Sequence, residues 1–115
     1  MEHLKGFQRK ALRGQAHGLK PVVSVGRRGM TDALFRAVDQ ALERHELIKV
    51  KFIEMKEKEE KQAASRFLEE KTRCELVGLI GHTGIFFRRN EDPEKHRVFL
   101  PRTSGEQPGP GPKDV

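Results

Sequence analysis

The length of 115 residues fits one domain, and the single cysteine excludes an intramolecular disulfide and a thiolate metal cluster. No run approaches the ~18 apolar residues that a membrane helix needs, and the N-terminus lacks an apolar signal core, so we expect a cytoplasmic protein. The net charge of +6 favours a polyanionic partner, and it is unevenly placed. Residues 1–29 hold seven Lys and Arg against one acidic residue, whereas sixteen basic residues face sixteen acidic ones from Met30 onward.

The first expected element is a basic amphipathic helix over residues 4–17. Its apolar side chains recur at helical spacing, at Leu4, Phe7, Ala11 and Leu12. Its cations recur every fourth residue on another face, and Lys20 follows in the next connection. This basic segment is a candidate RNA-binding surface, formed by Lys5, Arg9, Arg13 and Lys20.

A short β-branched strand is expected over residues 21–25, and a helix from the N-cap Thr31 to about His45. Between them lies a glycine loop formed by Gly26, Arg27, Arg28 and Gly29. A helix N-terminus favours an anion, glycines allow a phosphate to approach closely, and arginines supply charge. KH domains clamp an RNA backbone with a comparable loop. The alternative is a tight turn with solvated arginines, and the neighbouring basic helix favours the RNA-binding interpretation.

The second half predicts a strand over residues 47–53, a helix over 57–72, and strands over 75–80 and 85–89 joined by a hairpin turn at 81–84. Residues 97–100 are expected to add a short edge segment. The predicted core between helices and sheet comprises Leu34, Val38, Leu42, Val50 and Phe52. Four further cations could extend the basic surface: Lys49, Lys51, Arg88 and Arg89. We expect a domain over residues 1–102 and a disordered Pro/Gly-rich tail over residues 103–115.

Catalytic and metal-binding functions find little support. The five histidines show no metal-ligand spacing, and Cys74, between a helix and a strand, is expected to be a small buried side chain. We therefore expect no catalytic residue, no metal and no cofactor. The chain has no Trp or Tyr, so an obvious base-stacking platform is absent from the sequence and recognition should depend on RNA backbone and shape.

Several segments together resemble one family, the bacterial YhbY proteins, which consist of a single CRM (chloroplast splicing and ribosome maturation) domain. The resemblance covers roughly residues 4–102 and rests on segments 12–17 (LRGQAH), 19–23 (LKPVV), 25–31 (VGRRGMT), 45–51 (HELIKVK), 80–84 (IGHTG) and 100–102 (LPR). Taken together these segments are specific, although each alone is weak.

The resemblance implies an α/β (α+β) two-layer sandwich with the order α-β-α-β-α-β-β and a four-stranded mixed sheet, similar to the C-terminal domain of translation initiation factor 3. It also implies RNA binding through the loop at Gly26 to Gly29. Stand-alone bacterial members are associated with precursors of the large ribosomal subunit, so we expect a monomeric ribosome-assembly factor that binds structured ribosomal RNA by its backbone. Two alternatives stay open: a splicing or general RNA cofactor, and a basic protein-interaction module with an acidic partner.

Overall fold

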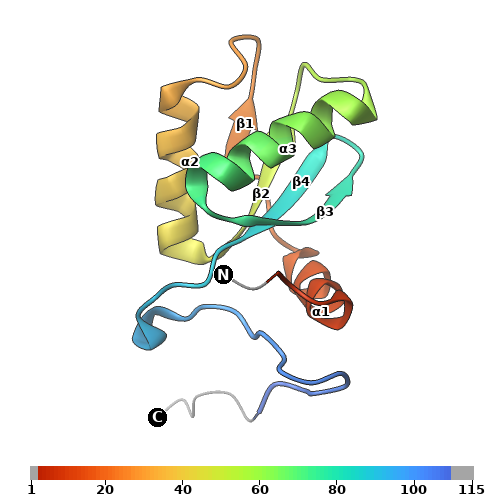
Figure 1. Ribbon diagram of the computed structural model, residues 1–115, viewed down its shortest axis with the longest axis vertical. Coiled ribbons are helices and arrows are strands. Elements are labelled where there is room, and N and C mark those ends of the chain that lie inside the picture. The colour runs from red at the N-terminus through yellow and green to blue at the C-terminus, as the bar shows by residue number, and fades with distance from the viewer. Residues whose placement is uncertain (1–2, 110–115) are drawn as a thin grey trace.

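A computed structural model describes residues 3–109 (Figure 1). Three helices and four strands alternate as expected, in the order α-β-α-β-α-β-β, followed by one 3-10 turn. The elements are α1 (Gly6–Ala16), β1 (Val23–Val25), α2 (Asp32–His45), β2 (Leu47–Phe52), α3 (Lys58–Thr72), β3 (Glu75–Ile80), β4 (Thr83–Phe87) and η1 (Pro93–Lys95).

The four strands form one mixed sheet in the order β1-β2-β4-β3. The edge strand β1 runs parallel to β2, because α2 carries the chain back across the sheet between them. The other two contacts are antiparallel, and β3 and β4 form a hairpin. The predicted mixed four-stranded sheet is therefore confirmed.

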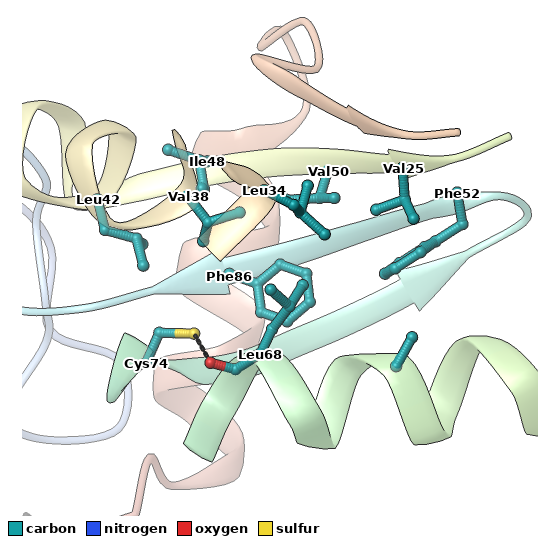
Figure 2. Close-up of a cluster of buried hydrophobic side chains, with 11 residues drawn as sticks. Val25, Leu34, Val38, Leu42, Ile48, Val50, Phe52, Leu68, Cys74 and Phe86 are labelled. Atoms are coloured by element: carbon teal, nitrogen blue, oxygen red, sulfur yellow. Dashed lines mark hydrogen bonds between the residues drawn. The ribbon is translucent and has the colours of Figure 1, made fainter. Parts of the chain in front are cut away.

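Helices α2 and α3 cover one face of the sheet and enclose the larger hydrophobic core (Figure 2). The alternation of β2 explains this core, since Ile48, Val50 and Phe52 point into it while the lysines between them point away. All five residues of the predicted core are buried here: Leu34, Val38, Leu42, Val50 and Phe52. The predicted apolar face of α2 is thus confirmed.

The opposite face of the sheet carries a second, smaller core. Leu12 and Ala16 of α1 are fully buried there against Val77, Ile85 and Phe87. Val98 and Leu100 pack against the same cluster from the segment that follows β4. Helix α1 therefore adds a partial third layer to the expected two-layer sandwich, at the end of the sheet remote from the residue 26–29 loop (Figure 1).

Several boundaries differ from the sequence-based expectation, and β1 begins at Val23 rather than at residue 21. Residues 97–100 form no strand, because side chains of Gln15 and Glu46, rather than a neighbouring strand, bind their backbone groups. Strand β4 spans Thr83–Phe87 instead of residues 85–89, so Gly84 lies within the strand and the turn shortens to Gly81 and His82, while Arg88 and Arg89 follow the strand. The expected tail is described only to residue 109, with a turn closed by Glu106 N donating to Thr103 O at 3.1 Å, and residues 110–115 lie outside the described range.

Candidate nucleic-acid interface

The loop of residues 26–29 is a tight turn at the carboxyl end of β1. The N–H of Gly29 donates to the carbonyl of Gly26 at 3.0 Å, which places Arg27 and Arg28 at the two central positions. Gly29 has a φ of +71°, a conformation that favours glycine. Both arginines are exposed. The turn therefore presents two guanidinium groups to solvent beyond the edge of the sheet.

Helix α2 begins at Asp32, with two residues, Met30 and Thr31, between it and this turn. Thr31 caps it by accepting a hydrogen bond from the N–H of Leu34 at 3.1 Å. The positive end of the helix dipole thus lies beside the two arginines, an arrangement that attracts anions. Asp32, in the first turn, is exposed and carries the opposite charge. An incoming phosphate would accordingly be favoured on the arginine side of the helix end.

Four other predicted contact residues are exposed: Lys5, Arg13, Lys20 and Lys51. Lys5 is the N-cap of α1, and Lys20 lies in the connection between α1 and β1. The stem of Arg13 crosses the sheet above Gly78, where an added Cβ would lie 3.1 Å from Arg13 Cδ. Arg13 and Lys51 lie on the α1 side of the sheet, and the four cations with the 26–29 turn make up the candidate basic surface.

Arg9 and Lys49 instead hold the protein together. Arg9 forms an ion pair with the buried carboxylate of Glu75 and donates to the Leu4 carbonyl at 2.7 Å. Glu75 also accepts hydrogen bonds from the backbone N–H of Leu4, so this carboxylate fixes the segment that leads into α1. Lys49 Nζ donates to the carbonyl of Leu19 at 2.9 Å and to that of His17 at 3.3 Å, beyond the end of the same helix.

Arg88 and Arg89 are committed to internal partners in the same way. Arg88 donates to Asp39 Oδ1 at 2.6 Å and to the Thr72 carbonyl at 2.7 Å, which joins α2 to the end of α3. Arg89 pairs with Glu46 at 3.2 Å and donates to the Val98 carbonyl at 2.8 Å. Neither guanidinium is presented freely to a ligand.

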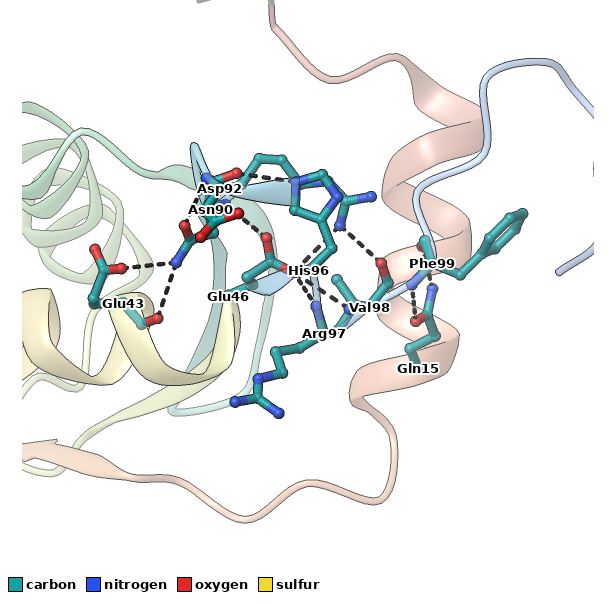
Figure 3. A network of polar contacts seen from close by, with 10 residues as sticks. Gln15, Glu43, Glu46, Asn90, Asp92, His96, Arg97, Val98 and Phe99 are labelled. Atoms are coloured by element: carbon teal, nitrogen blue, oxygen red, sulfur yellow. Dashed lines mark hydrogen bonds and ion pairs between the residues drawn. The ribbon is translucent and has the colours of Figure 1, made fainter. Parts of the chain in front are cut away.

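Glu46 lies at the centre of a polar network that sequence reasoning did not single out (Figure 3). Its carboxylate is fully buried and accepts hydrogen bonds from the backbone N–H groups of Asn90 at 2.6 Å and Arg97 at 2.5 Å. A signal was available, because an acidic residue at a helix C-terminus is opposed by the dipole and requires compensation. The network fixes the chain that follows β4.

One aromatic pair at the surface was also missed. The rings of Phe35 and Phe67 stack with centroids 5.8 Å apart, and Phe67 is 48% exposed. Lys71 Nζ lies 5.8 Å from the centroid of Phe35. The pair bridges α2 and α3 on the side of the sheet opposite α1.

Within residues 3–109, no three His, Cys, Asp or Glu side chains gather into a possible metal site. No helix in the same range is long and apolar enough to cross a membrane. Cys74 is buried, and this burial raises the pKa of its thiol to about 11. A thiol that stays protonated at neutral pH is a poor nucleophile.

The chain is similar in sequence to proteins of one known family. The family model of the CRS1 / YhbY (CRM) domain matches residues 4–88. A Haemophilus influenzae protein named "RNA-binding protein" is 35% identical over 102 residues, which cover 89% of this chain and 99% of the relative. "Probable RNA-binding protein YqeI" of Bacillus subtilis is 36% identical over 98 residues, covering 85% and 99% of the two chains.

A solved structure agrees with the fold. The solution structure of the hypothetical protein SAV1595 from Staphylococcus aureus superposes with a TM-score of 0.73 at 31% identity. It covers 86% of this chain and 100% of its own. The likeness therefore extends over most of this chain.

Proposed function

This chain belongs to the CRS1/YhbY (CRM) domain family, and from that premise we propose that it binds RNA through the turn at residues 26–29. The observation that carries the proposal is the exposure of Arg27 and Arg28 at the centre of a hydrogen-bonded turn beside a helix N-terminus. Curated relatives from two bacteria are named for RNA binding, which supports the same class of ligand.

The proposed contact surface is narrower than the set of cations that the sequence suggests. It comprises Gly26, Arg27, Arg28 and Gly29 with the exposed cations Lys5, Arg13, Lys20 and Lys51. The internal bonds of Arg9, Lys49, Arg88 and Arg89 assign these four a supporting role. Phosphate contacts position a nucleic acid without reading its sequence, so the surface should grip RNA backbone with little sequence preference.

The salt dependence of RNA affinity tests this contact surface. Replacing both loop arginines, Arg27→Ala with Arg28→Ala, removes two phosphate contacts and should flatten the log–log salt slope by roughly 1.4 to 1.8. The matched control is Arg44→Ala with Arg66→Ala, two exposed arginines on α2 and α3 outside the proposed surface. Binding is followed by fluorescence anisotropy over a salt series. Equal slopes for wild type and the loop variant would refute the assignment.

The proposed cellular role is assembly of the large ribosomal subunit, and the likeness to bacterial YhbY proteins supports it. Crosslinking in cells followed by sequencing of the bound RNA should recover precursor large-subunit RNA. Recovery of intron or mixed RNA instead would favour a splicing or general RNA cofactor. Failure to bind naked RNA, with an acidic protein recovered in its place, would favour a protein-interaction module.

A further inference from the structure

One half of the sheet face on the α1 side is left open. The strand register places four residues in a row across it, since Ser24 pairs with Lys51, Lys51 with Thr83, and Thr83 with Ile80. Their neighbours along the strands, such as Val25 and Phe52, point into the core under α2 and α3. Because side chains alternate along a strand, the row faces the opposite side.

Helix α1 does not reach this row. Its buried residues Leu12 and Ala16 pack on Leu47, Val77, Ile85 and Phe87, nearer the other end of the same strands. Ser24 and Lys51 are exposed, Thr83 is half-buried, and Ile80 is 63% exposed. Among residues 3–109, Ile80 is the most exposed of the large apolar side chains. Ile53, the residue after β2, is also 51% exposed.

The open row continues the basic turn. Ser24 lies two residues before Gly26, so the row begins close to the start of the 26–29 turn. Adjacent strands are roughly 4.8 Å apart, and a row across four of them is therefore roughly 14 Å long. It offers one cation, two hydroxyl groups and one apolar side chain, and it has no acidic member. The RRM domain also binds two or three unpaired bases on the face of a four-stranded sheet, but it stacks them on aromatic side chains, whereas this row offers the apolar side chain of Ile80.

We infer that this open row, formed by Ser24, Lys51, Thr83 and Ile80, binds unpaired nucleotides adjoining the phosphates held by the 26–29 turn. The inference rests on the proposed RNA-binding function and deepens it. Lys51 neutralises a phosphate and Ile80 packs against a base. The hydroxyl groups of Ser24 and Thr83 donate hydrogen bonds to base edges or accept hydrogen bonds from them. Base edges and faces are accessible in single strands but stacked and paired in a duplex, so the preferred ligand is single-stranded RNA.

The test exchanges the chemistry of two row positions without changing charge or strand propensity. The double variant Ile80→Thr with Thr83→Val keeps a β-branched side chain at each position and swaps the apolar and hydroxyl groups. The control Phe67→Gln alters an apolar side chain that is 48% exposed on the helical side. The folded state of each variant is checked by circular dichroism. Affinity is measured for an unstructured RNA and for an RNA duplex of equal length.

The row variant should bind unstructured RNA about three- to tenfold more weakly, below the loss seen for aromatic stacking platforms, and bind duplex RNA as wild type does. Phe67→Gln should change neither affinity. An unchanged affinity for unstructured RNA, or an equal loss with duplex, would overturn the inference. The Arg27→Ala, Arg28→Ala variant separates the two proposals: if it weakens binding while the row variant does not, the turn binds RNA and the row does not.

Discussion

The buried carboxylate of Glu46 offers a stringent test of how the chain after β4 is held in place. Its Oε1 accepts from Arg97 N at 2.5 Å, Val98 N at 3.3 Å and Arg89 Nη1 at 3.2 Å, and its Oε2 accepts from Asn90 N at 2.6 Å. All of these partners are donors. The substitution Glu46→Gln keeps the shape of the side chain but turns one acceptor into a donor that faces another N–H group.

The expected cost follows from those contacts. A hydrogen bond to a charged group contributes about 1.5–3 kcal/mol, and breaking a buried ion pair costs about 3–5 kcal/mol. The Arg89 side chain is 29% exposed, so water replaces part of the lost pairing. We therefore expect Glu46→Gln to lower the free energy of unfolding by about 2–4 kcal/mol.

Urea denaturation measures the global effect, and amide hydrogen exchange at Asn90, Arg97 and Val98 measures the local one. Both should change, with exchange accelerated at these three amides first. The backbone needs its own control, because Glu46 has a φ of +65°. Glu46→Gly relieves that strain by about 1 kcal/mol while removing the carboxylate, so it should be less damaging than Glu46→Ala. A Glu46→Gln protein within about 0.5 kcal/mol of wild type would refute the reasoning.

Two further predictions concern stability. Gly84→Ala should lower the free energy of unfolding, measured in urea, by about 1–3 kcal/mol. The added Cβ would lie 2.7 Å from a ring carbon of Phe86 and 3.1 Å from one of Phe52, and both rings are fully buried. The control Gly14→Ala should cause no loss of stability, because the new Cβ has no neighbouring atom within 4 Å. The raised pKa of Cys74, about 11 against an ordinary 9.0, means that the unfolded thiol ionises first. The stability that this group contributes should be intact below pH 9 and lost as the pH rises toward 11. The urea midpoint of the wild type should therefore fall relative to that of Cys74→Ala over this range. A difference between the two midpoints that stays constant with pH would contradict the assignment.

Local patterns in the sequence predicted most of the fold. The alternation over β2 and the helical spacing of Leu34, Val38 and Leu42 identified the larger core, and the resemblance to YhbY proteins is confirmed by the family match. These signals are local because each depends on side chains within a few residues of one another. The position of α1 on the second face depends instead on contacts with Val77 and Ile85, far along the chain, which no local period encodes.

The difference between local patterns and contacts far apart in the chain also explains which parts of the candidate site could be predicted. The turn at Arg27 and Arg28 was predictable because its glycines and the Thr31 cap lie within a short segment. Whether a basic residue elsewhere is available to a ligand depends on remote acidic partners. Arg9 finds Glu75, and Arg89 finds Glu46, across separations of 66 and 43 residues. The sequence shows that such residues are charged, but it does not show which acidic residue each one pairs with in the fold.

Glu46 also connects the sheet to residues beyond the family match. The family match stops at residue 88, yet three of the backbone N–H groups that satisfy this carboxylate belong to Asn90, Arg97 and Val98. Gln15 extends the connection, accepting from Phe99 N at 2.9 Å and donating to Phe99 O at 2.6 Å. A chain truncated at the family boundary would retain a buried anion and lose its donors. We therefore expect the smallest stably folded fragment to extend beyond the residues that the family model matches, and grafts or fusions of this domain should preserve the sequence through Pro101, whose carbonyl accepts from Gln8 of α1 at 2.9 Å.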